Sequence, residues 1–178
     1  MAIKPLMILP PAIFVGLAVM FYVGMQRTNP DELPSAFIGQ DAPPVSTEVL
    51  PGIPGLTAEA LASGDIRLVN FWASWCPPCR AEHPRLMKMA AEGIQIAGVN
   101  MKDDPDAALG FLAQDGNPYS GVAFDPRGRT SIDWGVTAPP ETFVIGKDGK
   151  VLFRFIGPLV GTDYERRFVP ALQDALSQ

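Results

Sequence analysis

The first feature of the hydrophobic pattern is an unbroken apolar segment near the N-terminus. Leu6 to Met25 is a run of 20 residues without a charge, which is long enough to cross a bilayer core of about 30 Å as a helix. Pro10 and Pro11 are expected to mark the first turns of this helix. Because Lys4 precedes the run, the pattern favours an N-terminus in the cytoplasm and predicts a membrane anchor over residues 1–27.

A cleaved signal peptide is the alternative interpretation of the same segment. Gly16-Leu17-Ala18 has the spacing of a small-x-small cleavage site, with a shorter apolar core before it. This site lies inside the apolar run, which favours an uncleaved anchor. Both interpretations export the remainder of the chain.

Beyond the anchor, the long apolar run gives way to short alternating and periodic segments. Residues 28–44, rich in proline, are expected to form a linker, and residues 45–178 a single folded domain. Ser46 and Glu48 alternate with β-branched neighbours. This alternation predicts an added strand or part of a hairpin over residues 45–50.

The domain alternates strand-like and helix-like segments. Thr57 is expected to cap a short helix. An apolar run around Val69 has the composition of a buried strand, and a helix follows it as far as Gly93. A second strand, a helix capped by Asp104 and a hairpin come later, which predicts an α/β fold with parallel pairing and right-handed crossovers. The segments expected after the first long helix are 94–99, 105–112, 120–124, 129–134, 142–145 and 151–155.

The last helix is expected to begin with a capping box formed by Thr162 and Glu165. Pro170 should bend or restart this helix, because proline lacks the backbone N–H that continues it. The apolar periodicity predicts that four residues face the core: Phe168, Val169, Leu172 and Leu176.

Composition and charge narrow the class of protein. An apolar content of 47% excludes a disordered chain. Two of the 14 basic residues and none of the 19 acidic residues precede Thr28, so the remainder carries a net charge of −7. An acidic body repels nucleic acid, and it suits a soluble domain or a basic partner.

The chemistry of the chain centres on its only two cysteines, which stand three positions apart where the strand meets the helix. Pro77 and Pro78 suit the first turn of a helix, so Cys76 falls at the helix N-terminus. Unpaired N–H groups and the helix dipole stabilise a thiolate there. Cys79, one turn further in, is expected to be more buried and to act as the resolving thiol.

Other uses of a cysteine pair depend on the ligands that the chain offers. A closed zinc site needs four ligands, whereas this chain has two cysteines and one histidine, His83. Haem attachment requires a histidine after the second cysteine, where this chain has Arg80. A structural disulfide or a redox-inert interaction module fits the strand–helix position less well than redox chemistry does. A copper-binding chaperone that uses Cys76, Cys79 and His83 as soft ligands remains an alternative.

Residues 71–79, Phe-Trp-Ala-Ser-Trp-Cys-Pro-Pro-Cys, resemble the active site of thioredoxin-like proteins. Later segments narrow the match to the periplasmic thioredoxin-like reductants of cytochrome c maturation, the CcmG/DsbE family. The resemblance covers most of the chain from about Asn29 onward. The segments similar to that family are Asn100–Asp104, Gly116–Tyr119, Asp133–Val136 and Pro140–Phe143.

The resemblance implies a thioredoxin-like fold, with a central mixed sheet flanked by helices and an N-terminal transmembrane helix. It implies a single-pass protein of the inner (cytoplasmic) membrane whose C-terminal domain faces the periplasm. The Cys76/Cys79 dithiol would reduce disulfides of apocytochrome c, or of a thiol protein that handles apocytochrome, during cytochrome c biogenesis. A membrane electron donor of the DsbD or CcdA type would restore the dithiol. A general periplasmic disulfide reductase or oxidase is the alternative within the same enzyme class.

The resemblance also assigns two positions beside the cysteines. It puts a cis-proline at Pro140, although Pro139 stands where the family usually has alanine. The extra proline removes a backbone donor. Asn70 takes the place of the buried aspartate of thioredoxins and cannot titrate, so another acid or water must accept the proton of Cys79.

Glu82 and Glu141 are the candidates for that proton transfer. Helix spacing puts Glu82 on the same face as Cys79, and the alternative for Glu82 is a solvated helix residue. His83 is expected to have a surface or structural role, and residues 102–104 to form a solvated loop or a partner contact. The predicted catalytic residues are Cys76 and Cys79, and the residues predicted to tune them are Glu82, Pro140, Glu141, Trp75, Pro77 and Pro78, with no metal and no cofactor besides the Cys76–Cys79 disulfide.

Overall fold

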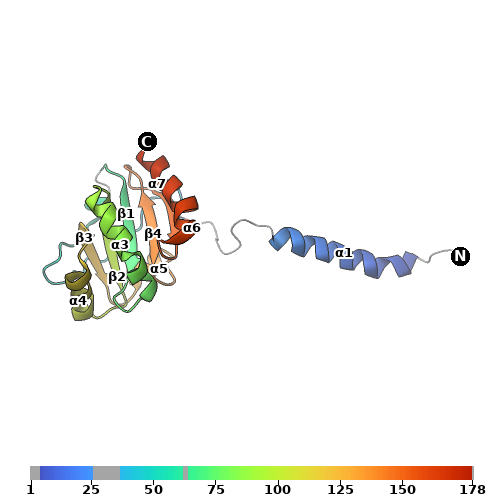
Figure 1. Cartoon of the computed structure of the whole chain (residues 1–178), viewed down its shortest axis with the longest axis horizontal. Helices are drawn as coiled ribbons and strands as arrows, with labels where there is room; N and C mark the ends of the chain where they lie inside the picture. The colour runs from blue at the N-terminus through green and yellow to red at the C-terminus, as the bar shows by residue number, and fades with distance from the viewer. Residues whose placement is uncertain (1–4, 26–36, 62–63, 178) are drawn as a thin grey trace. The chain divides into compact units, whose positions relative to one another are not determined.

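The computed structural model describes residues 5–25, 37–61 and 64–177 of the chain. Its contacts divide the chain into two compact units, Met1–Pro34 and Ser35–Gln178. The first unit holds helix α1, Pro5–Met25 (Figure 1), which starts before Pro10 and Pro11 rather than at them. Among the described residues, no helix has the length and hydropathy needed to cross a membrane.

The second unit is built on a five-stranded sheet in the order β3-β2-β1-β4-β5. The predicted apolar strand is its centre, β1, Arg67–Trp72, and every residue of β1 is buried. A strand buried on both faces needs apolar residues at consecutive positions rather than alternate ones, which is the pattern seen here. β1 pairs in parallel with β2 and antiparallel with β4, so the sheet is mixed. The other strands are β2 Gln95–Met101, β3 Gly121–Asp125, β4 Glu141–Ile145 and β5 Val151–Ile156.

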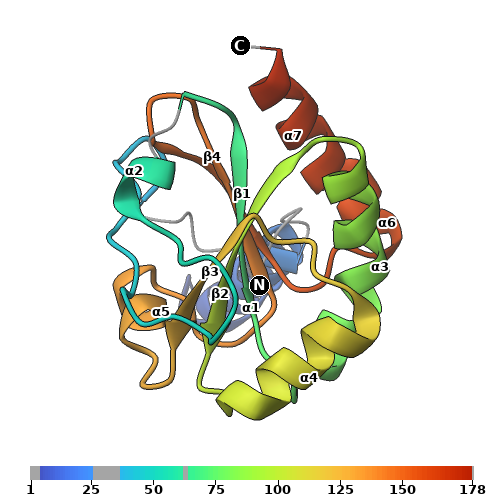
Figure 2. The ribbon, with the colours of Figure 1, turned by 90° about the vertical axis from the view of Figure 1, so that its left-hand side faces the viewer.

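Helices cover both faces of this sheet, as Figure 2 shows. The crossovers β1–α3–β2 and β2–α4–β3 join parallel neighbours that follow one another in the same direction across the sheet. Crossovers of one hand therefore place α3 and α4 on the same face. The C-terminal helices lie on that face as well, and two short helices cover the other. The bounds are α3 Pro77–Ala91, α4 Pro105–Asp115, α6 Gly161–Asp163 and α7 Val169–Leu176 on the first face, and α2 Ala58–Leu61 and α5 Arg129–Asp133 on the second.

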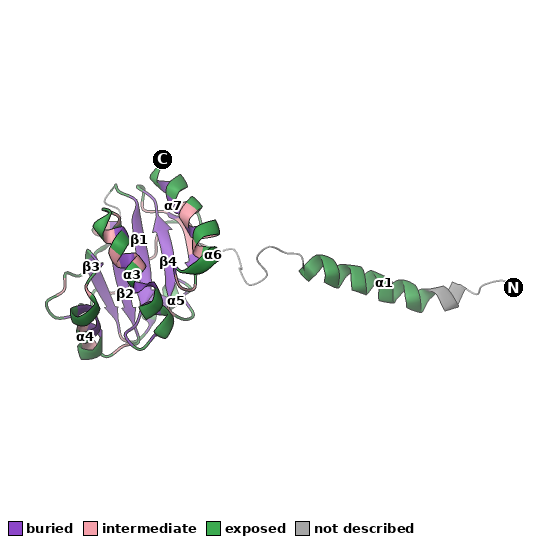
Figure 3. Cartoon of the chain, viewed as in Figure 1, coloured by how far each residue is buried: buried purple, intermediate pink, exposed green. Residues whose placement is uncertain are grey.

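The core lies along both faces of the sheet, and Figure 3 shows the strands buried beneath helices that are exposed on their outer sides. On the α2 and α5 face, Phe71, Trp134 and Phe143 form an aromatic cluster with ring centroids 5.0–5.6 Å apart. Burying a side chain of this size stabilises the fold by about 1.5–3 kcal/mol. The cluster fixes β1 against β4, and the two strands carry the residues around the cysteines.

Two predicted helix caps are confirmed. The Asp104 carboxylate accepts hydrogen bonds from the backbone N–H groups of Asp106 and Ala107, both at 3.0 Å, at the start of α4. The Thr57 hydroxyl accepts from the N–H of Ala60 at 3.2 Å, at the start of α2. Each side chain satisfies N–H groups that the helix itself leaves unpaired.

The predicted strand over residues 45–50 is wrong, because that segment forms no regular strand. It follows the edge of β3 through isolated bonds, from Phe124 N–H to the Glu48 carbonyl and from Val122 N–H to the Pro54 carbonyl, both at 2.8 Å. The Ser46 N–H donates to the Thr130 hydroxyl and the Glu48 N–H to the Ser46 hydroxyl, so these donors do not enter a ladder. Earlier in the chain, Ile38 pairs with Val151 of β5, and Asp41 pairs with Lys150, the residue before β5.

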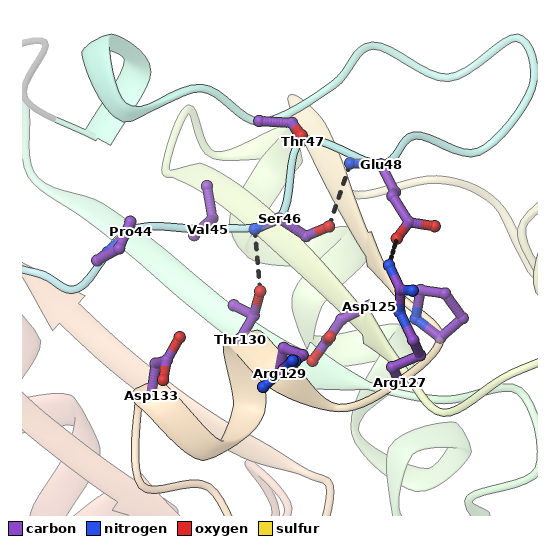
Figure 4. Close-up of a pocket in the computed structure, with 11 residues that line it drawn as sticks. Pro44, Val45, Ser46, Thr47, Glu48, Asp125, Arg127, Arg129, Thr130 and Asp133 are labelled. Carbon is purple, nitrogen blue, oxygen red and sulfur yellow. Dashed lines mark hydrogen bonds and ion pairs between the residues drawn. The ribbon is translucent and has the colours of Figure 1, made fainter.

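Side chains hold the same segment against α5 and the turn between β3 and α5 (Figure 4). The Thr130 hydroxyl accepts from the Ser46 N–H at 2.9 Å, and Arg127 pairs with Glu48 at 2.7 Å. These residues line an open cavity of about 330 Å³. The segment is thereby held in place by contacts to distant residues, although it has no secondary structure of its own.

The C-terminal helix differs from its predicted form in two ways. No side-chain bond caps α6, so the capping box is wrong. A π-helical turn, η1 Tyr164–Phe168, precedes α7, and the Val169 N–H donates to the Tyr164 carbonyl. Pro170 has no N–H for the normal bond, and the wider turn rotates the residues that follow. As a result, Leu176 is 49% exposed, contrary to prediction, and the neighbouring Ala175 is buried.

Candidate active site

The two cysteines lie at the start of α3, immediately after β1 and a short turn. Cys76 is the N-cap of α3, and Pro77 and Pro78 occupy its first positions. Cys76 and Cys79 are joined in a disulfide, and the Cys79 N–H points at the Cys76 sulfur from 3.2 Å. After reduction, this N–H and the helix dipole would stabilise a thiolate on Cys76.

In this disulfide, the prediction that Cys79 is the more buried cysteine does not hold, because each cysteine is 2% exposed. The neighbouring Pro77 and Pro78 are exposed, so the helix start itself reaches the surface. The two sulfurs therefore differ by their place in the helix rather than by burial.

The turn before Cys76 is clamped to the loop after β2. The Asp103 carboxylate accepts from the Ser74 N–H at 2.6 Å, from the Ser74 hydroxyl at 2.7 Å and from the Asn100 amide at 2.9 Å. The Lys102 carbonyl accepts from the Trp75 indole at 2.9 Å. Trp75 is 56% exposed, so these bonds hold a large apolar surface beside Cys76. Residues 102–104 are thus part of the site's framework rather than a merely solvated loop.

Replacing Asp103 by asparagine is expected to loosen this turn. The substitution puts an NH2 group where a carboxylate oxygen now accepts two donors, and a lost buried bond costs about 1–3 kcal/mol. We expect a lower melting temperature and a faster decay of tryptophan fluorescence anisotropy. The exposed Asp106 is the matched control. Asp106→Asn should leave the melting temperature and the anisotropy decay unchanged. Equal effects of the two substitutions would contradict the clamp.

The start of β4 approaches the cysteines from the other side. The Pro139–Pro140 peptide bond is cis, in agreement with the resemblance. The register of β1 and β4 sets Glu141 opposite Phe71, and the Pro139 carbonyl lies 3.5 Å from the Cys76 sulfur. Neither proline has an N–H, so the carbonyl is the hydrogen-bonding group that this segment offers next to Cys76.

Glu82, three residues after Cys79 on α3, is completely buried, so the alternative of a solvated residue is wrong. One carboxylate oxygen accepts from the Asn70 amide and the other from the Leu159 N–H, both at 2.8 Å. Burial disfavours the charged form and raises the pKa of Glu82 to about 7, although both hydrogen bonds lower it. A carboxyl group with such a pKa can both accept and release a proton near neutral pH.

Glu141 is buried too, but it has a charged partner. Arg154 donates its Nε to Glu141 Oε2 at 2.7 Å, and the Thr137 N–H donates to Oε1 at 3.2 Å. Burial raises the pKa of Glu141, and the bond and charge of Arg154 oppose that shift. The two acids therefore differ in kind, since Glu82 is held by neutral donors and Glu141 by a cation.

His83 has a structural place rather than a surface one. It is 4% exposed, its Nε2 lies 3.0 Å from the Gly116 carbonyl, and its ring meets that of Phe111 edge-on at 4.7 Å. These contacts hold α3 against the end of α4. Within the part of the chain that the structure describes, no group of three or more His, Cys, Asp or Glu side chains is arranged to hold a metal ion.

Two residues of the site lie outside the sequence-based prediction, Arg154 and Tyr119. Arg154 pairs with Phe143 across the hairpin. Alternation along a strand then puts it on the same face as Glu141, a signal that the hairpin pattern contains. Tyr119 donates its hydroxyl to the Asn70 amide oxygen at 3.0 Å. No periodicity connects these two residues, which are 49 positions apart.

The sequence and the fold are both similar to those of known redox proteins. The Redoxin family profile matches residues 38–169. The thiol:disulfide interchange protein DsbE homolog of Paracoccus denitrificans is 54% identical, over 98% of this chain and 97% of that protein. The thiol:disulfide interchange protein HelX of Rhodobacter capsulatus is 45% identical, over 95% of this chain and 96% of that protein.

Among solved structures, a putative thiol:disulfide interchange protein DsbE from Chlorobium tepidum is 32% identical to this chain. It superimposes with a TM-score of 0.62, over 76% of this chain and 95% of that structure. A putative thioredoxin from Neisseria meningitidis, 25% identical, has a TM-score of 0.60 over 77% of this chain and 93% of that structure.

Proposed function

Because this chain belongs to the Redoxin family, and within it to the thiol:disulfide interchange proteins of the DsbE type, we propose that it reduces disulfides of apocytochrome c, or of a thiol protein that handles apocytochrome. The chain is a thiol–disulfide oxidoreductase with a thioredoxin-like fold. The observation that carries the proposal is the Cys76–Cys79 disulfide at the start of α3, with Cys76 as the N-cap of the helix.

In the proposed reaction, the Cys76 thiolate attacks one sulfur of the partner's disulfide, and the other partner sulfur leaves as a thiolate. Cys79 then loses its proton and attacks the Cys76 sulfur, which releases the second partner sulfur. The partner gains two electrons, and the chain is left with the Cys76–Cys79 disulfide seen in the structure. The exposed Trp75 and the Pro139 carbonyl supply apolar contact and one backbone acceptor for the partner.

We assign the proton of Cys79 to Glu82 rather than to Glu141. Glu82 lies three residues beyond Cys79 on the same helix face, and its two hydrogen bonds come from neutral groups, Asn70 and Leu159. Glu141 forms an ion pair with Arg154. Protonation of Glu141 would therefore leave the Arg154 guanidinium without its anionic partner. Glu141 serves instead to hold the start of β4 beside the cysteines.

The proposal includes a place in the cell and a source of electrons. The segment of residues 1–27 would anchor the chain in the inner membrane as a single-pass protein, with the remainder in the periplasm. Support comes from the uncharged run Leu6–Met25 and from the apolar side chains described at the surface of α1. A membrane donor of the DsbD or CcdA type would return two electrons to the disulfide after each reaction.

The reduction potential tests the direction of the reaction. We expect the full-length chain, equilibrated in a thiol redox buffer and followed by tryptophan fluorescence, to show one reversible two-electron transition near or below about −200 mV. Trp72 and Trp75 flank the cysteine motif and report the change. A potential near about −120 mV would indicate an oxidant and contradict the proposal. Stoichiometric copper binding by the reduced chain that His83→Ala abolishes would favour the copper chaperone instead.

A peptide assay tests the substrate. The reduced chain should reduce an oxidised Cys-Xaa-Xaa-Cys-His peptide faster than a general disulfide peptide of equal length and charge. Equal rates for the two peptides would favour a general disulfide reductase over a reductant of apocytochrome.

A further inference from the structure

A tyrosine that the proposed reaction does not use lies next to its proton acceptor. Tyr119, in the segment before β3, is 6% exposed, and its ring stacks on that of Trp72 at 5.4 Å. Its hydroxyl donates to the Asn70 side-chain oxygen at 3.0 Å. Packing alone would be served as well by phenylalanine, so the hydroxyl calls for a separate explanation.

The hydroxyl completes the bonding of the Asn70 amide. The amide nitrogen of Asn70 donates to Glu82 Oε1 at 2.8 Å and to the Thr142 hydroxyl at 3.0 Å, while its oxygen accepts from Tyr119. The two ends of an asparagine amide have nearly the same shape, so the neighbouring donors and acceptors decide which end points where. Here the Tyr119 hydroxyl donates to the amide oxygen, and this bond stabilises the orientation that turns the NH2 group toward Glu82.

The orientation of the Asn70 amide affects the protonation of Glu82, because few other groups in the described part of the chain contact that carboxyl group. β1 contributes the neutral Asn70, whose amide also donates to Thr142 of β4, and the chain after β5 contributes the Leu159 N–H. Cys79 precedes Glu82 by one helical turn, and Tyr119 interacts with it electrostatically. An NH2 group toward Glu82 stabilises its carboxylate, whereas an amide oxygen in the same place would stabilise the protonated acid.

We propose that Tyr119 is a positioning residue for proton transfer, because its hydroxyl holds the Asn70 amide with the NH2 group toward Glu82 and so favours the carboxylate that accepts the Cys79 proton. This inference rests on the proposed function, in which Glu82 is that acceptor. Burial raises the pKa of Tyr119 well above its ordinary value, so the hydroxyl keeps its proton and remains a donor throughout the reaction.

Removing the hydroxyl tests the inference. In Tyr119→Phe the Asn70 oxygen loses its donor, and the amide can turn that oxygen toward Glu82. A hydrogen bond of ordinary net strength corresponds to an upward shift of roughly half to one pH unit in the pKa of Glu82. The measurement is a titration of the Glu82 carboxyl carbon by NMR in the reduced full-length chain, with the signal assigned by its loss in Glu82→Gln.

Tyr164→Phe is the matched control, because the Tyr164 ring stacks on Phe168 in the C-terminal helices. It should leave the pKa of Glu82 unchanged. 3-Fluorotyrosine at position 119 keeps the ring and is a stronger hydrogen-bond donor, so it should shift the pKa of Glu82 downward. This variant still tests the inference if Tyr119→Phe does not fold. An unchanged pKa in the fluorotyrosine variant and in any folded Tyr119→Phe would overturn the inference.

The pH dependence of mixed-disulfide resolution separates this inference from the proposed function. The midpoint of the resolution rate should move with the Glu82 pKa in the Tyr119 variants, and the pH step should disappear in Glu82→Gln. If Glu82→Gln keeps the pH step, Glu82 is not the proton acceptor and the proposed mechanism fails. The NMR titration would still decide whether Tyr119 controls the protonation of Glu82.

Discussion

Replacing Cys79 by serine is expected to stop the reaction at the mixed disulfide. Cys76 would still attack an oxidised peptide, but no second thiol would be in place to release it. Well-oriented intramolecular reactions reach effective molarities of about 10⁵ M or more, so millimolar external thiol cannot replace Cys79. Turnover should fall to the background rate, and non-reducing mass spectrometry should show one peptide joined to Cys76.

Cys76→Ser is the control for that experiment. It should also lose turnover, but without any covalent adduct, because Cys79 lies inside α3, whereas Cys76 caps the N-terminus of that helix. An adduct on Cys79 in Cys76→Ser, or normal turnover in Cys79→Ser, would contradict the assignment of Cys76 as the attacking thiol.

The free energy of unfolding is expected to depend on pH through Glu82. Its pKa is raised from 4.5 to about 7 in the folded chain, so the folded state binds more protons than the unfolded state between these values. The contribution of Glu82 is therefore complete below about pH 4.5 and is lost as pH rises to about 7, by roughly 3 kcal/mol. Denaturant unfolding of the oxidised chain at a series of pH values measures this loss.

Glu82→Gln separates this effect from the other carboxyl groups. Glutamine cannot titrate, so the difference in stability between the two chains should change across this pH range and be constant above it. Both oxygens of Glu82 accept N–H donors, and the glutamine NH2 group meets one of these donors. A cost of about 1–3 kcal/mol independent of pH should therefore accompany the loss of the slope. A wild-type chain whose stability runs parallel to that of Glu82→Gln would show that Glu82 does not titrate in this range.

The expectations that succeeded rest on neighbours close in sequence. The position of the cysteines follows from an apolar run that ends where two prolines can start a helix. The cap of α4 needs only Asp104 and the residues just after it, and the hairpin needs only two alternating segments and a turn. Such features depend on backbone geometry over a few residues, so the sequence contains them.

The expectations that failed depend on what a segment meets in three dimensions. The segment of residues 45–50 has the alternation of a strand, but the N–H groups of Ser46 and Glu48 bond to side-chain hydroxyls instead of forming a ladder with β3. Leu176 fits the helical periodicity, but the π-turn before α7 rotates it outward. In both cases the local pattern correctly indicated an amphipathic segment, but it did not contain the contacts that the segment makes with the rest of the fold.

By itself, the sequence determined the redox pair, its place at the start of a helix and the α/β order of the elements. Only the tertiary structure decided which acid could serve that pair. Helical spacing puts Glu82 on the cysteine face, but its burial depends on Asn70 and on Leu159, which lies 77 residues away. A charged group's pKa depends on the solvent and donors around it, and folding alone brings those together.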